Sequence, residues 1–502
     1  MTFVERSARC LPSPAERHHS RPKRVGTSIK GWLRKDANMT ILKVTKYTAL
    51  GLAVLGNSVV VAAAGDFDPS YNGLGFTRDF IPDSSTASDL SIDSTGRIVN
   101  AGNYYSLSEQ SEHLVVWRRL ADGTPDAMFG GTGVVYPISP PGLVESSNNS
   151  IAIDNQDRIV MVTGTETGHL VHRLNVDGTP DLSFSGTGHN DIPLRPRVVP
   201  ITGVAIQPNN QIVAVAGAVN PASGHREFVV YRLQENGNLD PNFGGTGVVY
   251  TEMTPGGGLD AATGVALQPD GKIVVAGRAR SLLPGSYYDF ALARYLPTGV
   301  LDPDFGSDGK VIFSILDDDF GRRVVVQPDG KIVIAGSVCV DLGSGNSHCY
   351  LGAARVDERG ALDPSFAGTG KVYTDVGGTR GGSAFNVALQ SDNKIIVVGV
   401  HQLNADSSLM NAILLRYQPD GSLDPTFGLN GISETGYGYS SNFSGAVRIQ
   451  SDGQIVVSGS TGRDPIAARS VVTARYLASD NLFPRAAGTA ILPSSSCRTH
   501  AQ

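Results

Sequence analysis

The stretch QPDGKIVVAG, residues 268–277, decides the fold of this chain. Pro-Asp-Gly before an apolar run is typical of a tight turn that enters a buried strand, because glycine adopts the positive φ that such a turn requires. Clear copies of the block begin at Gln327, Gln390 and Gln450, and weaker copies begin at Asp93, Asp154 and Gln207. Seven copies of one block predict a repeat architecture.

Two further blocks recur with the same period of about 59 residues. One is an alternating run that ends in an arginine followed by Asp-Gly or Asn-Gly, as in LLRYQPDGSLD, residues 414–424. The other is the tetrad Asp-Pro-x-Phe or a near variant, which begins at Asp68, Asp126, Asp181, Asp240, Asp302, Asp363 and Asp424. We therefore expect four short antiparallel strands, a to d, in each repeat. In the fourth repeat strand a ends near Gln268, and strands b, c and d cover residues 272–276, 291–295 and 310–313.

The spacing between blocks separates constant connections from variable ones. The last residue of strand a and the isoleucine of strand b are five residues apart in all seven copies, and the strand c arginine precedes the next tetrad aspartate by eight residues in six. The connection from strand b to the strand c arginine, in contrast, ranges from nine to nineteen residues. In an up-and-down sheet the a–b and c–d turns lie at one end, here named the constant face. The b–c and d–a connections lie at the other end, the variable face.

These features predict an all-β, seven-bladed β-propeller with four antiparallel strands per blade. Near-continuous apolar runs such as residues 332–335 suit strands that are covered on both faces by neighbouring blades. A parallel β-helix is the alternative repeat fold, but its coils are much shorter and lack two tight hairpin turns per repeat.

The arginine and aspartate series predict how the ring closes. Six pairs match at the spacing of eight, namely Arg118–Asp126, Arg173–Asp181, Arg232–Asp240, Arg294–Asp302, Arg355–Asp363 and Arg416–Asp424. Arg475 and Asp68 are left over, and we expect them to meet, with residues 68–80 supplying the outer strand of the last blade. The N-terminal strand would then complete the ring. An anion-binding ring of arginines is the functional alternative, but repetition in every blade favours a structural pair.

The periodic LDPxFG and QPDGKIVVAG blocks resemble the delta-60 repeats of bacterial secreted and surface proteins and, more loosely, the NHL class of propellers. The resemblance covers residues 66–480 and implies a propeller, but it supplies no catalytic motif. The early copies depart from the pattern, because Ala127 and Leu182 stand where it has proline.

The first 64 residues have the features of targeting segments rather than of a repeat. We expect residues 1–38 to be a basic leader from a start codon called too far upstream, and residues 39–64 to be a signal peptide that ends in three alanines. Residues 65–480 would form the propeller and residues 481–502 a disordered C-terminal tail. The mature chain would be secreted, periplasmic or on the cell surface, without a transmembrane anchor, and we expect a monomer.

The charge of the mature chain argues against nucleic acid as a partner. The 502 residues include 41 Lys and Arg and 47 Asp and Glu, and residues 1–64 hold 11 and three of these. The remainder has a net charge of −14, which repels phosphate backbones. No cofactor motif is present, whereas cationic ligands, calcium included, are compatible with such a surface.

Cys339 and Cys349 flank the longest b–c loop, between strands that should pair. A disulfide suits this placement and an oxidising compartment, whereas two ligands alone make a poor metal site.

Three groups of unrepeated residues on the variable face are candidates for function. Asp317, Asp318 and Asp319 follow one another in a d–a loop and offer oxygen ligands for a hard cation, although a solvated acidic turn is the simpler interpretation. Arg278, Arg280, Tyr287 and Tyr288 share one b–c loop and suit a sugar- or protein-binding edge. Four histidines all lie in b–c loops: His113, His225, His348 and His401. Together they would suit a metal site or a general base, whereas the simpler interpretation is four separate surface histidines.

Two functions fit these features. One is an exported binding or scaffold module that holds a protein, glycan or envelope component through the variable face. The alternative is an exported hydrolase or lyase that acts on a polysaccharide or small ester, with acidic residues or calcium at the channel mouth. Two or more unrepeated carboxylates or histidines within about 4–6 Å of one another in the channel would favour the enzyme, because such groups shift one another's pKa.

Overall fold

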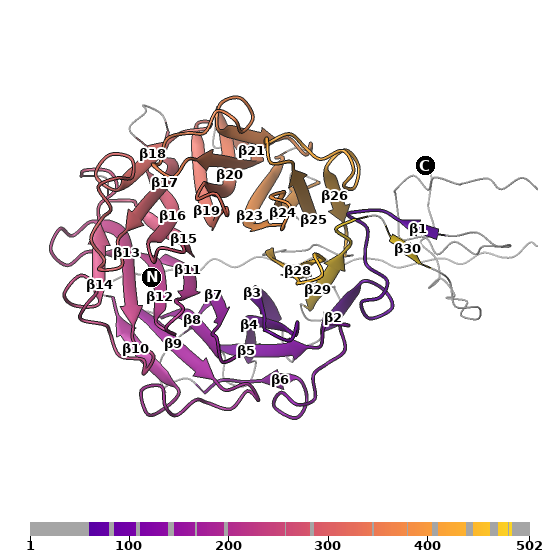
Figure 1. The fold of residues 1–502 in the computed structure, drawn as a ribbon, viewed down its shortest axis with the longest axis horizontal. Helices are drawn as coiled ribbons and strands as arrows, with labels where there is room; N and C mark the ends of the chain where they lie inside the picture. The colour runs from indigo at the N-terminus through magenta and orange to yellow at the C-terminus, as the bar shows by residue number, and fades with distance from the viewer. Residues whose placement is uncertain are drawn as a thin grey trace, which may run out of the picture. The chain divides into compact units, whose positions relative to one another are not determined.

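Seven four-stranded antiparallel sheets form the part of the chain that the computed structural model describes. The described residues are 60–79, 85–106, 111–138, 145–165, 168–194, 199–256, 258–281, 286–343, 346–378, 380–403, 410–437, 445–461, 470–479 and 481–483. Figure 1 shows the sheets arranged as blades around one axis, with the a strands innermost and the d strands outermost. The predicted seven-bladed, all-β propeller is therefore confirmed.

Each blade takes its strands in the order a, b, c, d. Blade 1 contains β3 (Ser85–Ile92), β4 (Ile98–Ser106), β5 (Ser111–Arg119) and β6 (Val134–Val135). Blade 2 contains β7 (Glu145–Ile153), β8 (Ile159–Thr165), β9 (Gly168–Leu174) and β10 (His189–Pro193). Blade 3 contains β11 (Val199–Ile206), β12 (Ile212–Val219), β13 (Arg226–Leu233) and β14 (Val248–Thr251). Blade 4 contains β15 (Ala261–Leu267), β16 (Ile273–Arg280), β17 (Tyr288–Tyr295) and β18 (Lys310–Phe313).

The remaining blades follow the same order. Blade 5 contains β19 (Asp318–Val326), β20 (Ile332–Gly343), β21 (Asn346–Val356) and β22 (Lys371–Thr374). Blade 6 contains β23 (Gly382–Leu389), β24 (Ile395–Gln402), β25 (Met410–Tyr417) and β26 (Ile432–Thr435). Blade 7 contains β27 (Ala446–Ile449), β28 (Ile455–Ser460), β29 (Val471–Tyr476) and, as its outer strand, β2 (Phe76–Asp79).

Blade 7 closes the ring because β2, from the N-terminal end, pairs with β29. The register joins Phe76 to Ala474 and Asp79 to Val471. The seam also contains the expected ion pair, since Arg475 Nε donates to Asp68 Oδ2 at 2.8 Å. The outer strand therefore comes from the N-terminal residues that the unmatched aspartate indicated.

One arginine staple repeats in every blade. The Nε and Oδ2 atoms of the paired arginine and aspartate lie 2.7 or 2.8 Å apart in all seven pairs. In six blades the guanidinium also lies 4.5–4.9 Å from the centre of the tetrad phenylalanine ring, and in the seam Tyr71 takes that place at 5.2 Å. Its Nη1 donates to a backbone carbonyl that follows strand c of the next blade. The tetrad is thus conserved along the chain because it joins strands c and d and links each blade to the next.

The hydrophobic core is divided among the interfaces between blades. Between blades 3 and 4, for example, Val213 and Phe228 pack against Ile273 and Ala291, all fully buried. The middle strands are consequently apolar on both faces, as in β12, where all but the last residue are buried.

The inner strands carry a β-bulge at a matching point. The register shifts in β3, β7, β11, β15, β19 and β23, and in β19 the shift lies between Gly321 and Arg323. A bulge leaves one residue unpaired and redirects its side chain, and bulges are common beside active sites. Arg322 is the bulged residue of β19.

The expected strand lengths need correction, and the expected terminal segments lie mostly outside the described residues. The b and c strands extend further toward the variable face than expected, because antiparallel pairing continues through residues assigned to loops: His113, Arg278, Arg280, Tyr288, His348 and His401 lie within strands. Strand a of blade 5 likewise begins at Asp318, so Asp318 and Asp319 pair with β20 and do not lie in the expected d–a loop. Residues 1–59 and 484–502 lie outside the described residues, so the basic leader, most of the signal peptide and the tail remain predictions. The described edges of these segments form a two-stranded sheet of β1 (Val60–Ala62) and β30 (Asn481–Phe483). None of the described residues forms a helix long and apolar enough to cross a membrane.

Candidate functional site: the variable face and the central channel

The longest hairpin of the variable face is held by a disulfide. Cys339 on β20 and Cys349 on β21 are cross-strand partners, and their sulfur atoms are bonded. The expected disulfide is therefore present, within the strands rather than in the loop between them. The bond ties together the two strands that carry this hairpin away from the ring.

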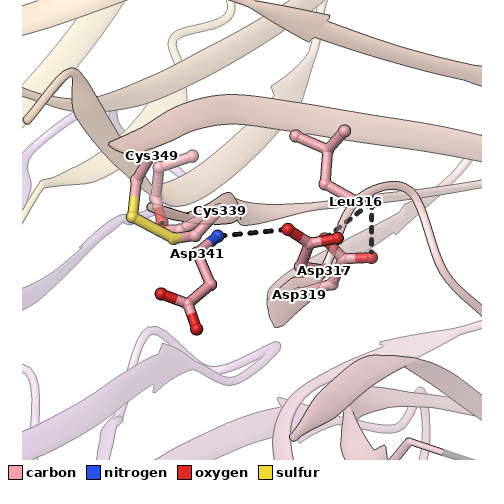
Figure 2. The surroundings of a disulfide bond; sticks show 8 residues. Leu316, Asp317, Asp319, Cys339, Asp341 and Cys349 are labelled. Atoms are coloured by element: carbon pink, nitrogen blue, oxygen red, sulfur yellow. Dashed lines mark hydrogen bonds between the residues drawn. A yellow bond between two sulfur atoms is a disulfide. The ribbon is translucent and has the colours of Figure 1, made fainter. Parts of the chain in front are cut away.

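The three consecutive aspartates beside this hairpin bind backbone amides instead of converging. Figure 2 shows Asp317 accepting a hydrogen bond from the amide of Asp341, at 3.1 Å. Asp318 Oδ1 accepts from the amides of Tyr287 at 2.7 Å and Tyr288 at 3.2 Å. Asp319 is fully buried and accepts from the amide of Leu316 at 3.2 Å. Each carboxylate therefore serves a different segment of backbone.

Burial raises the pKa of Asp319 to about 6, although the hydrogen bonds from the amides of Ile315 and Leu316 oppose the shift. Asp260 has a similar role in blade 4, where it is buried, has a raised pKa and accepts from the amides of Met253 and Thr254. Both carboxylates shape d–a connections. Among the described residues there is no group of three or more His, Cys, Asp or Glu side chains placed to hold a metal.

The four candidate histidines lie in four different blades and have partners close by. Three of them contact an acid at the end of the d strand in the same blade: the distances are 3.3 Å for His225 Nδ1–Glu252 Oε1, 3.3 Å for His348 Nε2–Asp375 Oδ1 and 2.9 Å for His401 Nδ1–Glu434 Oε1. His113 contacts Ser111 Oγ at 2.7 Å and stacks on Tyr104. The candidate histidines therefore form separate pairs and not one shared centre.

The arginine and tyrosine candidates divide into an exposed part and a packed part. Tyr287 is 65% exposed, and Arg280 is also exposed. Arg278 instead lies with its guanidinium carbon 4.6 Å from the ring centre of Tyr288 and 5.4 Å from that of Phe320 in blade 5. Tyr287 and Arg280 are thus available to a partner, whereas Tyr288 supports Arg278.

A cavity of about 320 Å³ lies along the inner strands of all seven blades. Its polar lining consists of side chains that do not repeat: Asp89, Ser150, Arg323, Asn386 and Arg448. Arg448 Nη2 lies 3.2 Å from Asp89 Oδ1, and Ser150 Oγ donates to Asp89 Oδ2 at 3.0 Å. Arg323 donates to the carbonyl of Thr263 in blade 4. The described lining contains one carboxylate, Asp89, and no histidine.

Sequence reasoning missed these channel residues, although a signal existed. Asp89, Ser150, Arg323 and Asn386 each stand four residues before the Asp or Gln that opens the a–b turn, where blades 3 and 4 have glycine. Aligning the repeats on the constant a–b turn would have exposed this unrepeated column. The variable loops differ between blades in length, whereas these aligned positions differ only in side-chain chemistry.

The comparisons with known proteins agree with the repeat and assign no ligand. The family model described as Domain of unknown function (DUF5122) beta-propeller matches residues 207–243, 268–305, 327–366 and 390–427, which run from the a–b turn to the tetrad in blades 3 to 6. A comparison with curated proteins finds no match.

Several solved structures are similar at low identity. A protein of unknown function from Dyadobacter fermentans is 10% identical, with 80% of this chain and 97% of that chain covered and a TM-score of 0.41. The polysaccharide lyase Uly1 is 11% identical, with 80% and 91% covered and a TM-score of 0.46. The β-propeller domain of the trilobed protease from Pyrococcus furiosus is 10% identical, with 80% and 96% covered and a TM-score of 0.43.

Proposed function

We propose that the chain is an exported binding or scaffold module, of the delta-60 repeat kind, that holds a protein, glycan or envelope component through its variable face. The observation that carries this proposal is the separation of the reactive side chains. His225, His348 and His401 each pair with an acid of their own blade, and the consecutive aspartates bind backbone amides. These pairs lie in three different blades, and none of them belongs to the described lining of the central cavity, so they do not form one shared acid and base centre there.

Export is supported by the disulfide between Cys339 and Cys349, because such bonds persist in oxidising compartments. Exposed Tyr287 and Arg280 offer a partner the kinds of side chain that are enriched at interfaces.

The experiment measures retention and cleavage in parallel. Immobilised polysaccharides and envelope fractions are incubated with the exported protein, and both the bound protein and any released reducing ends or unsaturated products are quantified. We expect retention without cleavage. Sustained product release would overturn the binding function in favour of the hydrolase or lyase.

A matched pair of variants tests the role of the variable face. Tyr287→Ala removes a 65% exposed ring from the variable face, and Leu182→Ala removes a 67% exposed side chain from the tetrad of blade 2 on the constant face. We expect the first variant to weaken retention and the second to leave it unchanged. Equal losses in both variants would show that this edge has no special part in binding.

A further inference from the structure

Two of the arginines that do not repeat, Arg278 and Arg322, differ from the repeated ones in their hydrogen bonds. A repeated arginine such as Arg294 gives Nε to Asp302 at 2.8 Å and Nη1 to the carbonyl of Glu358. The Nε atoms of Arg278 and Arg322, in contrast, are buried without an acceptor in the described part of the chain. Native proteins satisfy nearly all such donors, so these two guanidinium groups require another explanation.

Aromatic rings hold both unsatisfied guanidinium groups at blade interfaces. Arg278 lies over Tyr288 and over Phe320 of the next blade. Arg322, the bulged residue of β19, lies 5.9 Å from the ring centre of Phe385 in blade 6. Stacking on a ring fixes the plane of a guanidinium group and leaves its edge, where the N–H groups point, for an acceptor.

The same positive charge continues into the central channel. Arg323 follows Arg322 and lines the cavity, as does Arg448, whose side chain is 33% exposed. We name Arg278, Arg322, Arg323 and Arg448 the arginine track. Asp89, which Arg448 contacts, is the one carboxylate in the described cavity lining. In the described cavity lining, two arginines therefore face one carboxylate.

The electrostatic cost of this arrangement is visible in the track itself. Burial, together with repulsion from Arg278 and Arg323, lowers the pKa of Arg322 to about 10. The group is still charged at neutral pH. A buried charge without a partner is unfavourable, so a bound anion would relieve both the desolvation and the repulsion.

We propose that the arginine track binds an oxyanion, that is a sulfate, phosphate or carboxylate group, carried by a ligand that enters from the variable face. The planar edge of a guanidinium group matches two oxygens of such a group. The cavity of about 320 Å³, which Arg323 and Arg448 of the track line, accommodates the group and the atoms next to it. This inference rests on the proposed binding function, because it names the chemical class of the ligand.

The test titrates the exported protein with sodium sulfate, sodium phosphate and sodium acetate, with sodium chloride at equal ionic strength as the reference, and follows binding by calorimetry and by thermal melting. We expect saturable binding of at least one oxyanion, and the three titrations show which kind is preferred. Arg322→Gln and Arg278→Gln should weaken it about ten- to a hundredfold, the loss typical of a charged hydrogen bond. The control is Arg359→Gln, an exposed arginine of the constant face, which should bind as the wild type does.

Three results would overturn the inference: no saturable binding of any oxyanion, equal affinity in Arg322→Gln and the wild type, or an equal loss in Arg359→Gln. Arg448→Gln supplies a second track variant at a partly exposed position if Arg322→Gln fails to fold. The outcome is separable from that of the proposed function. A protein that binds sulfate through the track and also cleaves a polysaccharide keeps this inference and loses the binding function, whereas retention of neutral glycans without oxyanion binding gives the reverse.

Discussion

The seam of the ring offers the most demanding test of the fold, and Arg475→Met is the change that probes it. Arg475 Nε binds Asp68 at 2.8 Å, Nη2 binds Ser70 Oγ at 2.7 Å and Nη1 binds the carbonyl of Ala121 in blade 1 at 2.6 Å. One side chain therefore joins blade 7, its N-terminal outer strand and blade 1.

The expected loss of unfolding free energy depends on the hydrogen bonds that Asp68 keeps after the substitution. Asp68 is 2% exposed, and after the substitution its carboxylate keeps the hydrogen bonds from the amide and hydroxyl of Ser70. Removing one partner of a buried ion pair typically costs about 3–5 kcal/mol, and these remaining bonds place the value near about 3 kcal/mol. Asp68→Asn in the same chain should recover part of the loss, because the uncompensated charge is gone.

The assay is urea unfolding of the exported protein, combined with hydrogen exchange of β2. Arg294→Met is the matched control, since its staple joins strands within blade 4 and its partner is eight residues away. We expect similar losses of unfolding free energy in both variants, but faster exchange of β2 only in Arg475→Met. A loss of unfolding free energy below about 1 kcal/mol in Arg475→Met, as for an exposed ion pair, would show that Arg475 does not hold the seam. Unchanged hydrogen exchange of β2 in this variant would show the same.

Three further predictions concern the loops and the N-terminal end. Burial raises the pKa of Asp319 to about 6, so the folded chain holds a proton that the unfolded chain releases near pH 4, and the contribution of this group to stability falls by about 2–3 kcal/mol as pH rises between those values. Asp319→Asn should flatten this pH dependence of the unfolding free energy, measured by urea unfolding at pH 5 and pH 8. An unchanged dependence would contradict the prediction. Replacing Cys339 and Cys349 together by serine should lower the unfolding free energy by at most about 2–3 kcal/mol and should accelerate amide hydrogen exchange mainly at the tip of the β20–β21 hairpin. Faster exchange throughout the ring would show that the disulfide stabilises more than this hairpin. N-terminal sequencing of the exported protein should begin at Gly65, and a first residue upstream of Val60 would contradict the predicted cleavage after Ala64 and leave β1 in the mature chain.

The arrangement of the blades and the closure of the ring were predictable because the residues that form them recur at constant spacings. The eight residues between Arg294 and Asp302 hold the c–d turn, and the unmatched Arg475 and Asp68 indicated the closure directly. A repeated contact needs the same residues at the same distance in every blade, so it leaves a periodic signal.

The candidate site residues leave no periodic signal of this kind, because they differ from blade to blade. His225, His348 and His401 were expected in loops around one face, but the sequence does not show that each has an acid across its own blade. Arg323 and Arg448 lie 125 positions apart in the chain and line the same cavity because blades 5 and 7 stand around one axis. Such a meeting depends on three-dimensional placement and not on local pattern.

One paired measurement separates the repeated arginines, which hold the frame, from Arg322, which we infer binds a ligand: the melting temperature and the oxyanion affinity of Arg294→Gln and Arg322→Gln. We predict that Arg294→Gln lowers the melting temperature and keeps the affinity of the wild type. Arg322→Gln should lose affinity about ten- to a hundredfold and melt no lower than the wild type, because it removes a buried charge without an acceptor. The opposite assignment, with affinity lost in Arg294→Gln and stability lost in Arg322→Gln, would contradict the account.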